Sequence, residues 1–106
     1  MNAWLFLGGA IISEVTATLS LKRALDHPIY YSVVALGYVV AFVLLTLTLR
    51  QGLGIGVAYG VWAALGVGLT AVGSRFFFGE PLTAVMIAGL ALIIGGVLLV
   101  ELGSAH

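Results

Sequence analysis

The stretch that decides the fold is WLFLGGAIISEVTATLSL, which covers residues 4–21. It is apolar and long enough to cross a bilayer, which takes roughly 20 consecutive apolar residues in a helix. Its one ionisable residue, Glu14, lies near the middle of the run. A charged side chain at the centre of a membrane helix costs roughly 2.5–3.5 kcal/mol on insertion scales, so an acid at this depth indicates a functional site.

The rest of the chain repeats this apolar pattern. Of its 106 residues, 62% are hydrophobic and 8% are charged, whereas a soluble domain carries about 25% charged residues. Glycine, proline or charged residues interrupt the apolar runs, and the runs are too long and too uniformly apolar for barrel strands. We therefore predict an all-α membrane protein, a single domain of four transmembrane helices with short loops, at residues 3–21, 29–49, 54–76 and 82–102. The first run lacks the charged start and the cleavage site of a signal peptide, so we expect a mature helix there.

The charges of the chain argue against several classes of function. The net charge is zero and there is no basic patch, so we expect no nucleic-acid partner. The chain has no cysteine, and His27 and His106 are far apart in sequence, so we expect neither a metal site nor another cofactor. No nucleophile or second acid lies at the depth of Glu14, which argues against an enzyme.

Four helices with short loops enclose little space around an acid in mid-membrane, so we expect an oligomer, with a dimer as the first choice. With an even number of spans, Lys22, Arg23 and Arg75 share one side of the membrane, and Arg50 lies on the other with the terminal amine. This bias in positive charge is weak. It is compatible with insertion in either orientation, and so with dual topology and an antiparallel dimer. It is equally compatible with one orientation and a separate, oppositely biased partner.

Glu14 shares one face of its helix with mostly small or apolar residues, which are Leu7, Ala10, Ile11, Ala17, Thr18 and Leu21. The small neighbours Ala10 and Thr18 leave room for a partner helix or a ligand. Removal from water disfavours the charged form of a carboxyl group, and two such groups from two subunits would titrate as a pair. Such a site could hold a proton and release it when a cation arrives, which is the minimum that proton-coupled cation export requires. The alternative is a glutamate that is hydrogen-bonded for packing only.

An aromatic stripe lies on one side of the third span, at Tyr59, Trp62, Gly66, Thr70 and Gly73. Aromatic faces attract cations, tryptophan most strongly, and a tyrosine hydroxyl can bind a buried carboxylate. We therefore place Tyr59 and Trp62 in the candidate site. The alternative for both is an interfacial aromatic belt.

Tyr38 of the second span is a third aromatic candidate for the site. Trp4, Tyr30 and Tyr31 lie near helix ends, where we expect belt residues.

Two further patterns indicate helix association. Gly56, Gly60, Ala64 and Gly68 recur at every fourth position of the third span, which allows close helix contact and a kink. In the fourth span, GLALIIGGV at residues 89–97 is apolar with glycines near both ends, and it is typical of an association surface.

Four sequence fragments in one order carry a resemblance to a known family. The first is A-x-x-x-E followed by a lysine, at Ala10, Glu14 and Lys22. The second is G-x-A-Y-x-x-W at Gly56, Ala58, Tyr59 and Trp62, and the third is F-F-G-x-x-L at Phe77, Phe78, Gly79 and Leu82. The fourth is G-L-x-L-I-x-x-G-V at residues 89–97. In this order and spacing the chain resembles the small multidrug resistance family over nearly its whole length. That family exchanges protons for quaternary ammonium and other lipophilic cations across the prokaryotic cytoplasmic membrane.

The resemblance implies an antiparallel dimer in which Glu14 of both subunits binds either protons or a cationic substrate. It also implies that Tyr59, Trp62 and Tyr38 line the site. The fourth helices would hold the dimer together, and the interface would consist of Gly89, Leu92, Ile93, Gly96 and Val97.

One branch of the family exports guanidinium compounds and usually has Trp three residues after the glutamate and often Gly four before it. Here these positions are Ala17 and Ala10, which favours the multidrug branch. A guanidinium-type exporter and one half of a heteromeric pair remain the alternatives. The family's Gly-x-Gly kink after the tryptophan is replaced here by residues 64–66 with Gly68 beyond, which leaves the position of the hinge open.

Overall fold

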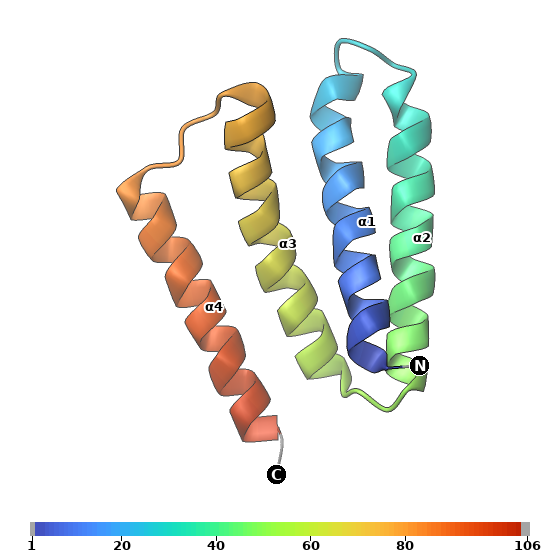
Figure 1. The fold of residues 1–106 in the computed structure, drawn as a ribbon, viewed down its shortest axis with the longest axis vertical. Coiled ribbons are helices and arrows are strands. Elements are labelled where there is room, and N and C mark those ends of the chain that lie inside the picture. The colour runs from blue at the N-terminus through green and yellow to red at the C-terminus, as the bar shows by residue number, and fades with distance from the viewer. Residues whose placement is uncertain (1, 105–106) are drawn as a thin grey trace. The chain divides into compact units, whose positions relative to one another are not determined.

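The computed structural model describes residues 2–104, which form four α-helices: α1 Ala3–Ala24, α2 Tyr30–Arg50, α3 Ile55–Phe78 and α4 Ala84–Ser104 (Figure 1). The helices contain 22, 21, 24 and 21 residues. At about 1.5 Å per residue, each is long enough to cross a hydrocarbon core about 30 Å thick. All four are also apolar enough to span a membrane. The predicted all-α fold with four transmembrane helices is confirmed.

The first helix ends later than the predicted residue 21. It continues to Ala24, so Lys22 and Arg23 form its last turn instead of the loop in which we expected them. Cations are favourable there because the exposed carbonyl groups make the C-terminal end of a helix negative. At the other end, Asn2 caps the helix by accepting a hydrogen bond of 2.8 Å from the Trp4 amide.

The turn between α3 and α4 also differs from the prediction. Helix α3 includes Phe78 and stops at Gly79, which adopts the left-handed conformation (φ 65°) that glycine allows at little cost. Helix α4 begins at Ala84 rather than at residue 82. The hydroxyl of Thr83 accepts a hydrogen bond of 3.2 Å from the Met86 amide, so Thr83 caps this helix.

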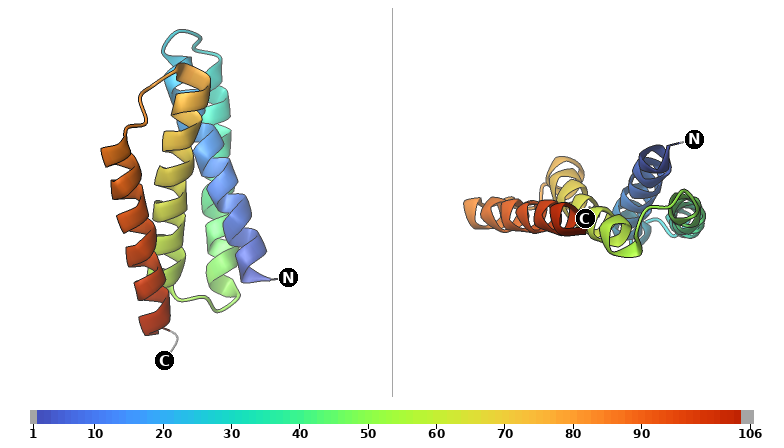
Figure 2. Two further views of the ribbon diagram at one scale, coloured as in Figure 1. Left: turned by 60° about the vertical axis from the view of Figure 1, so that its left-hand side comes forward. Right: turned by 90° about the horizontal axis from the view of Figure 1, so that it is seen from below.

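The chain divides into two compact units, residues 1–53 and 54–106. Each is an antiparallel helix hairpin, α1 with α2 and α3 with α4 (Figure 2). The first hairpin is held by small residues that let its helices approach closely. A Cβ atom added at Gly9 would lie 3.0 Å from Leu44 Cδ1, and one added at Gly37 would lie 2.8 Å from Ala17 Cβ.

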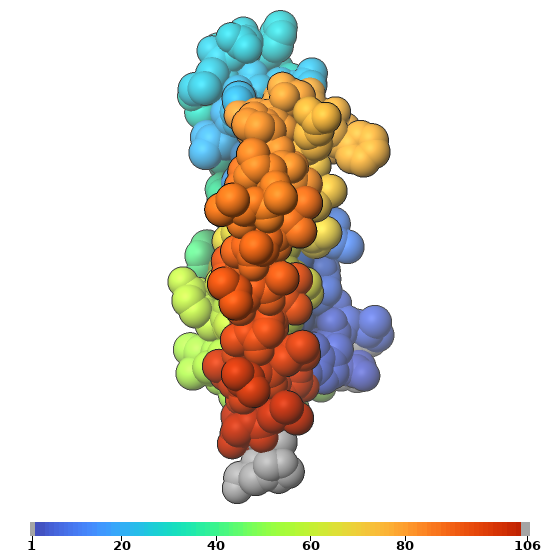
Figure 3. All heavy atoms as spheres, turned by 90° about the vertical axis from the view of Figure 1, so that its left-hand side faces the viewer, coloured from blue at the N-terminus to red at the C-terminus, as the bar shows by residue number. Residues whose placement is uncertain are grey.

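The second hairpin is more loosely packed. A Cβ atom at Gly60 of α3 would lie 3.9 Å from Val97 Cγ2 of α4. None of the residues of α4, all of which belong to the described part of the chain, is buried. Atoms of α4 lie at the surface along its length in Figure 3. This helix therefore presents an apolar surface that its own hairpin leaves uncovered.

Candidate functional site

The site begins at the closest approach of α1 and α2. A Cβ atom at Gly37 would meet the Cβ atom of Ala17 at 2.8 Å and the carbonyl oxygen of Ser13 at 3.1 Å. Only glycine lets the backbone of α2 come this near to α1. The next residue on each helix, Tyr38 and Thr18, is thereby brought within reach of the other.

Three of the predicted site residues form a hydrogen-bonded cluster at this point. The Oγ1 atom of Thr18 donates to Glu14 Oε1 at 3.3 Å. The same Oγ1 atom lies 2.7 Å from the hydroxyl oxygen of Tyr38. Glu14 and Thr18 come from successive turns of α1 and Tyr38 comes from α2. The structure therefore links Tyr38, a candidate of the second span, to the acid of the first through Thr18.

The second carboxylate oxygen of Glu14 is in a different situation. Glu14 Oε2 is buried and has no hydrogen-bond partner among the described residues. The basic residues of the chain lie in or near the last turns of helices, at Lys22, Arg23, Arg50 and Arg75. Because Lys22 follows Glu14 by eight positions, it lies about 12 Å further along the helix axis. A buried carboxylate oxygen with neither a donor nor a cation beside it can take up a proton or a positively charged ligand.

The predicted Glu14 face of α1 is mostly enclosed. The residues on it that are buried in the structure are Leu7, Ala10, Ile11 and Ala17. Ala10, one turn before Glu14, has 0% exposure, so its small side chain does not leave open space at that position. Leu21, at the end of the predicted face, is 42% exposed.

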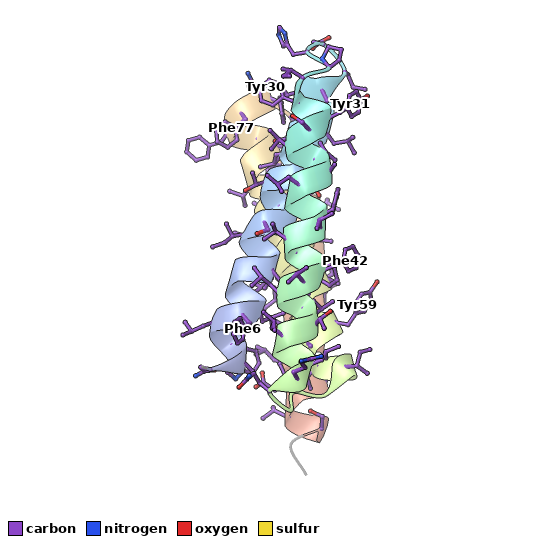
Figure 4. All side chains as sticks on the ribbon, turned by 90° about the vertical axis from the view of Figure 1, so that its right-hand side faces the viewer. Phe6, Tyr30, Tyr31, Phe42, Tyr59 and Phe77 are labelled. Atoms are coloured by element: carbon purple, nitrogen blue, oxygen red, sulfur yellow. The ribbon has the colours of Figure 1, made fainter. Side chains whose placement is uncertain are left out.

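The aromatic candidates of α3 form a pair of their own. The rings of Tyr59 and Trp62 meet edge to face, with centroids 5.8 Å apart and planes at 79°. Trp62 is 8% exposed whereas Tyr59 is 61% exposed, and Tyr59 projects from its helix in Figure 4. On the same stripe Gly66 is buried, and the buried hydroxyl of Thr70 has no hydrogen-bond partner among the described residues.

Tyr30 and Tyr31 lie at the N-terminal end of α2, beside the turn from α1 (Figure 4). The guanidinium carbon of Arg23 lies 5.8 Å from the centroid of the Tyr30 ring, and the His27 ring meets Tyr30 at 6.5 Å. These contacts occupy Tyr30 at the end of the hairpin. Neither tyrosine takes part in the Glu14 cluster.

Sequence reasoning missed the residues that set the distance between α1 and α2. Gly9 and Gly37 were not among the candidates, although each is a glycine inside an apolar span, which is the signal of close helix contact in membranes. Gly37 also precedes a candidate site residue directly. Among the repeated glycines of α3, which we predicted to allow close helix contact, a Cβ atom added at Gly60 would lie 3.9 Å from Val97 Cγ2. A Cβ atom added at Gly56 or Gly68 would meet no other group of the described chain within 4 Å.

Comparison with known proteins agrees with this architecture. The model of the Small Multidrug Resistance protein family matches residues 2–93. A multidrug transporter of Pseudomonas aeruginosa is 40% identical, over 98% of this chain and 96% of the relative. A multidrug resistance protein of Mycolicibacterium paratuberculosis is 37% identical, over 97% of this chain and 98% of the relative. With its four membrane-spanning helices, the chain is a multi-pass membrane protein that belongs to the small multidrug resistance family.

Proposed function

We propose that this protein is a proton-coupled antiporter that exports lipophilic cations, above all quaternary ammonium compounds, across the prokaryotic cytoplasmic membrane. Protons and the cation compete for Glu14. The observation that carries the proposal is the buried Glu14 Oε2 atom, which has no partner in the described part of the chain and lies mid-helix in a membrane span. The two relatives, which are named as multidrug proteins, support the substrate class.

The exchange follows from the cost of a charge in a membrane. An ionised Glu14 is expensive at this depth unless a positive charge compensates it. A bound cation supplies that charge, and a bound proton removes the need for it. The carboxylate therefore holds one or the other, and each cation that binds displaces a proton.

The type of cation follows from the other groups. A quaternary ammonium has no N–H donor, so it is held by charge and by aromatic faces rather than by directed hydrogen bonds. Tyr59 and Trp62 supply such faces, and their edge-to-face contact holds the two rings in a fixed orientation to each other. The Tyr38 hydroxyl adds a polar group that is linked to the acid through Thr18.

We further propose that two copies form an antiparallel dimer through α4. The exposed apolar surface of this helix supports the assignment. A Cβ atom added at its small residues Gly89 or Gly96 would meet no other group of the described chain within 4 Å, which leaves room for a second helix. The interface would consist of Gly89, Leu92, Ile93, Gly96 and Val97.

The proposal is tested by titrating the purified protein with tetraphenylphosphonium at a series of pH values. We expect the affinity to fall as the pH falls, and one proton to be released per Glu14 that the cation neutralises. Binding that is independent of pH, without proton release, would contradict the proposal. Guanidinium is titrated in parallel, and tighter binding of guanidinium than of tetraphenylphosphonium would favour the guanidinium-type exporter.

Expression of this chain alone in a drug-sensitive bacterium separates the homodimer from a heteromeric pair. Resistance to a quaternary ammonium compound without a partner chain supports the homodimer. A protein that binds the cation in the titration but confers resistance only with a second chain would be one half of a pair.

A further inference from the structure

The hydroxyl of Thr18 behaves differently from those of other threonines in the first hairpin. Thr16, Thr46 and Thr48 each donate to the backbone carbonyl oxygen four residues earlier, at 2.8 to 2.9 Å. This local bond is the usual arrangement for a threonine inside a helix. Thr18 donates instead to the side chain of the residue four positions earlier, at Glu14 Oε1. Its hydroxyl is thus committed to the acid and not to the backbone.

The chemistry of the three groups sets the direction of their hydrogen bonds. An ionised carboxylate can only accept, so Thr18 must donate its single proton to Glu14 Oε1. Thr18 then has no proton left for Tyr38, and the tyrosine hydroxyl must be the donor in the 2.7 Å contact. The order is Tyr38 to Thr18 to Glu14.

We propose that Thr18 is a positioning residue that, with Tyr38, forms a hydroxyl chain ending on Glu14 Oε1 and leaves Oε2 as the oxygen that takes the proton or the cation. This inference rests on the proposed function, and it gives the two carboxylate oxygens of Glu14 different roles. Oε1 is held by a donor from the protein, and Oε2 has no partner within the described residues. The hydroxyl chain stabilises the ionised form of Glu14 because its last donor, the Thr18 hydroxyl, points at the carboxylate.

Within the described part of the first hairpin, the groups that face Glu14 can be named. Helix α2 packs against α1, and its titratable or charged residues are Tyr30, Tyr31, Tyr38 and Arg50. Tyr30, Tyr31 and Arg50 lie at the two ends of α2, and Tyr38 alone of the four contacts the Glu14–Thr18 pair in the described structure. On α1 itself, Lys22 and Arg23 lie in the last turn. Within the described residues of the first hairpin, the hydroxyl chain is therefore the contact that favours an ionised Glu14.

The test measures the pH at which half of the tetraphenylphosphonium binding is lost, in the wild type and in Thr18→Val, which has the same shape without the hydroxyl. We expect this midpoint to rise by about one pH unit in Thr18→Val, because the ionised acid loses one charge-assisted hydrogen bond. Thr18→Ser keeps a hydroxyl and should restore the wild-type midpoint. Thr16→Val is the matched control, since the Thr16 hydroxyl bonds the Ile12 carbonyl, and should leave the midpoint unchanged.

A double-mutant cycle tests the order of the chain. Tyr38→Phe should raise the midpoint by less than Thr18→Val does. If Tyr38 acts through Thr18, the double variant should have the same midpoint as Thr18→Val alone. Additive shifts, or an unchanged midpoint in Thr18→Val, would overturn the inference.

Two readouts keep the outcomes distinct. Binding of tetraphenylphosphonium at high pH, where Glu14 is ionised in every variant, shows whether each variant is folded. If Thr18→Val does not bind there, Thr18→Ala replaces it in the same mutant cycle. A wild type that binds tetraphenylphosphonium without proton release would overturn the proposed function and this inference together. A wild type that releases protons, with a midpoint insensitive to Thr18, would overturn the inference alone.

Discussion

Gly37 of α2 lies against Ala17 of α1 so closely that a Cβ atom on the glycine would be 2.8 Å from the alanine Cβ. The Cβ atom added at Gly37 would also be 3.1 Å from the carbonyl oxygen of Ser13, so a backbone group of α1 lies against the glycine as well. The following residue on each helix, Tyr38 and Thr18, shares the 2.7 Å hydrogen bond. The spacing of the two backbones therefore sets the geometry of the cluster around Glu14.

The first prediction concerns this contact. Gly37→Ala should destabilise the protein by about 1–3 kcal/mol, because the added methyl group forces two packed helices apart. The separation should also lengthen the Thr18–Tyr38 contact and weaken cation binding. Unfolding in a denaturing detergent and the affinity for tetraphenylphosphonium measure the two effects.

Gly8→Ala is the control for this change, since no atom of the described chain lies within 4 Å of a Cβ at Gly8. Alanine favours a helix more than glycine does, by roughly 1 kcal/mol, so this control should be neutral or stabilising. Equal stability of the two variants would contradict the close packing of α1 and α2.

The second prediction concerns the acid. Glu14→Gln keeps the size of the side chain and an oxygen that can accept from Thr18, so the protein should still fold. It should lose proton release and the pH dependence of binding, because the amide cannot ionise. Glu101→Gln, near the end of α4, is the control and should behave as the wild type. Drug-driven proton release that persists in Glu14→Gln, measured in detergent, would rule out Glu14 as the exchanged site.

The third prediction concerns the buried tryptophan. Trp62→Phe keeps an aromatic ring but offers a weaker face to a cation, and cation–π contacts are worth about 0.5–2 kcal/mol. We expect the affinity for tetraphenylphosphonium at high pH to fall by a factor of about 2 to 30. Trp4→Phe changes an exposed tryptophan in the first turn of α1 and should have no effect. Equal affinities of the two variants would remove Trp62 from the site.

The fourth prediction concerns association through α4. Gly96→Leu should leave the α3–α4 hairpin intact, since no atom of the described chain lies within 4 Å of a Cβ at Gly96. It should weaken the dimer by about tenfold or more, because a large side chain prevents close contact between helices. Gly103→Leu, in the last turn of α4, is the matched control. Crosslinking yield in detergent at a series of protein concentrations compares the two, and equal yields would place the interface elsewhere.

Most of the fold could be predicted from the sequence, because a membrane span needs a long apolar run and the chain has four. The ends of the helices were less predictable. Lys22 and Arg23 are charged and so resemble loop residues, yet the end of a helix favours cations and α1 extends through both. Thr83 shortens α4 at its start by capping it, which hydrophobicity alone does not indicate.

The candidate site was predictable where one residue is anomalous by itself and unpredictable where two helices must be placed together. Glu14 is conspicuous in any apolar run. The contact of Thr18 with Tyr38 depends on the register of α1 against α2, and that register depends on Gly37, whose role becomes visible only in the packed hairpin. The aromatic pair on α3 was found by its spacing, but the exposure of Tyr59 was not.

The tight contact between Ala17 and Gly37 has a consequence for movement during transport. The backbone of α2 at Gly37 lies directly against the Ala17 side chain of α1. Because interiors are closely packed, the two helices cannot slide or rotate past each other without a steric clash at this contact. The first hairpin is therefore expected to travel as one rigid body. In the proposed antiport cycle, a rigid first hairpin would keep the Thr18–Tyr38 pair beside Glu14 whichever side of the membrane the site faces.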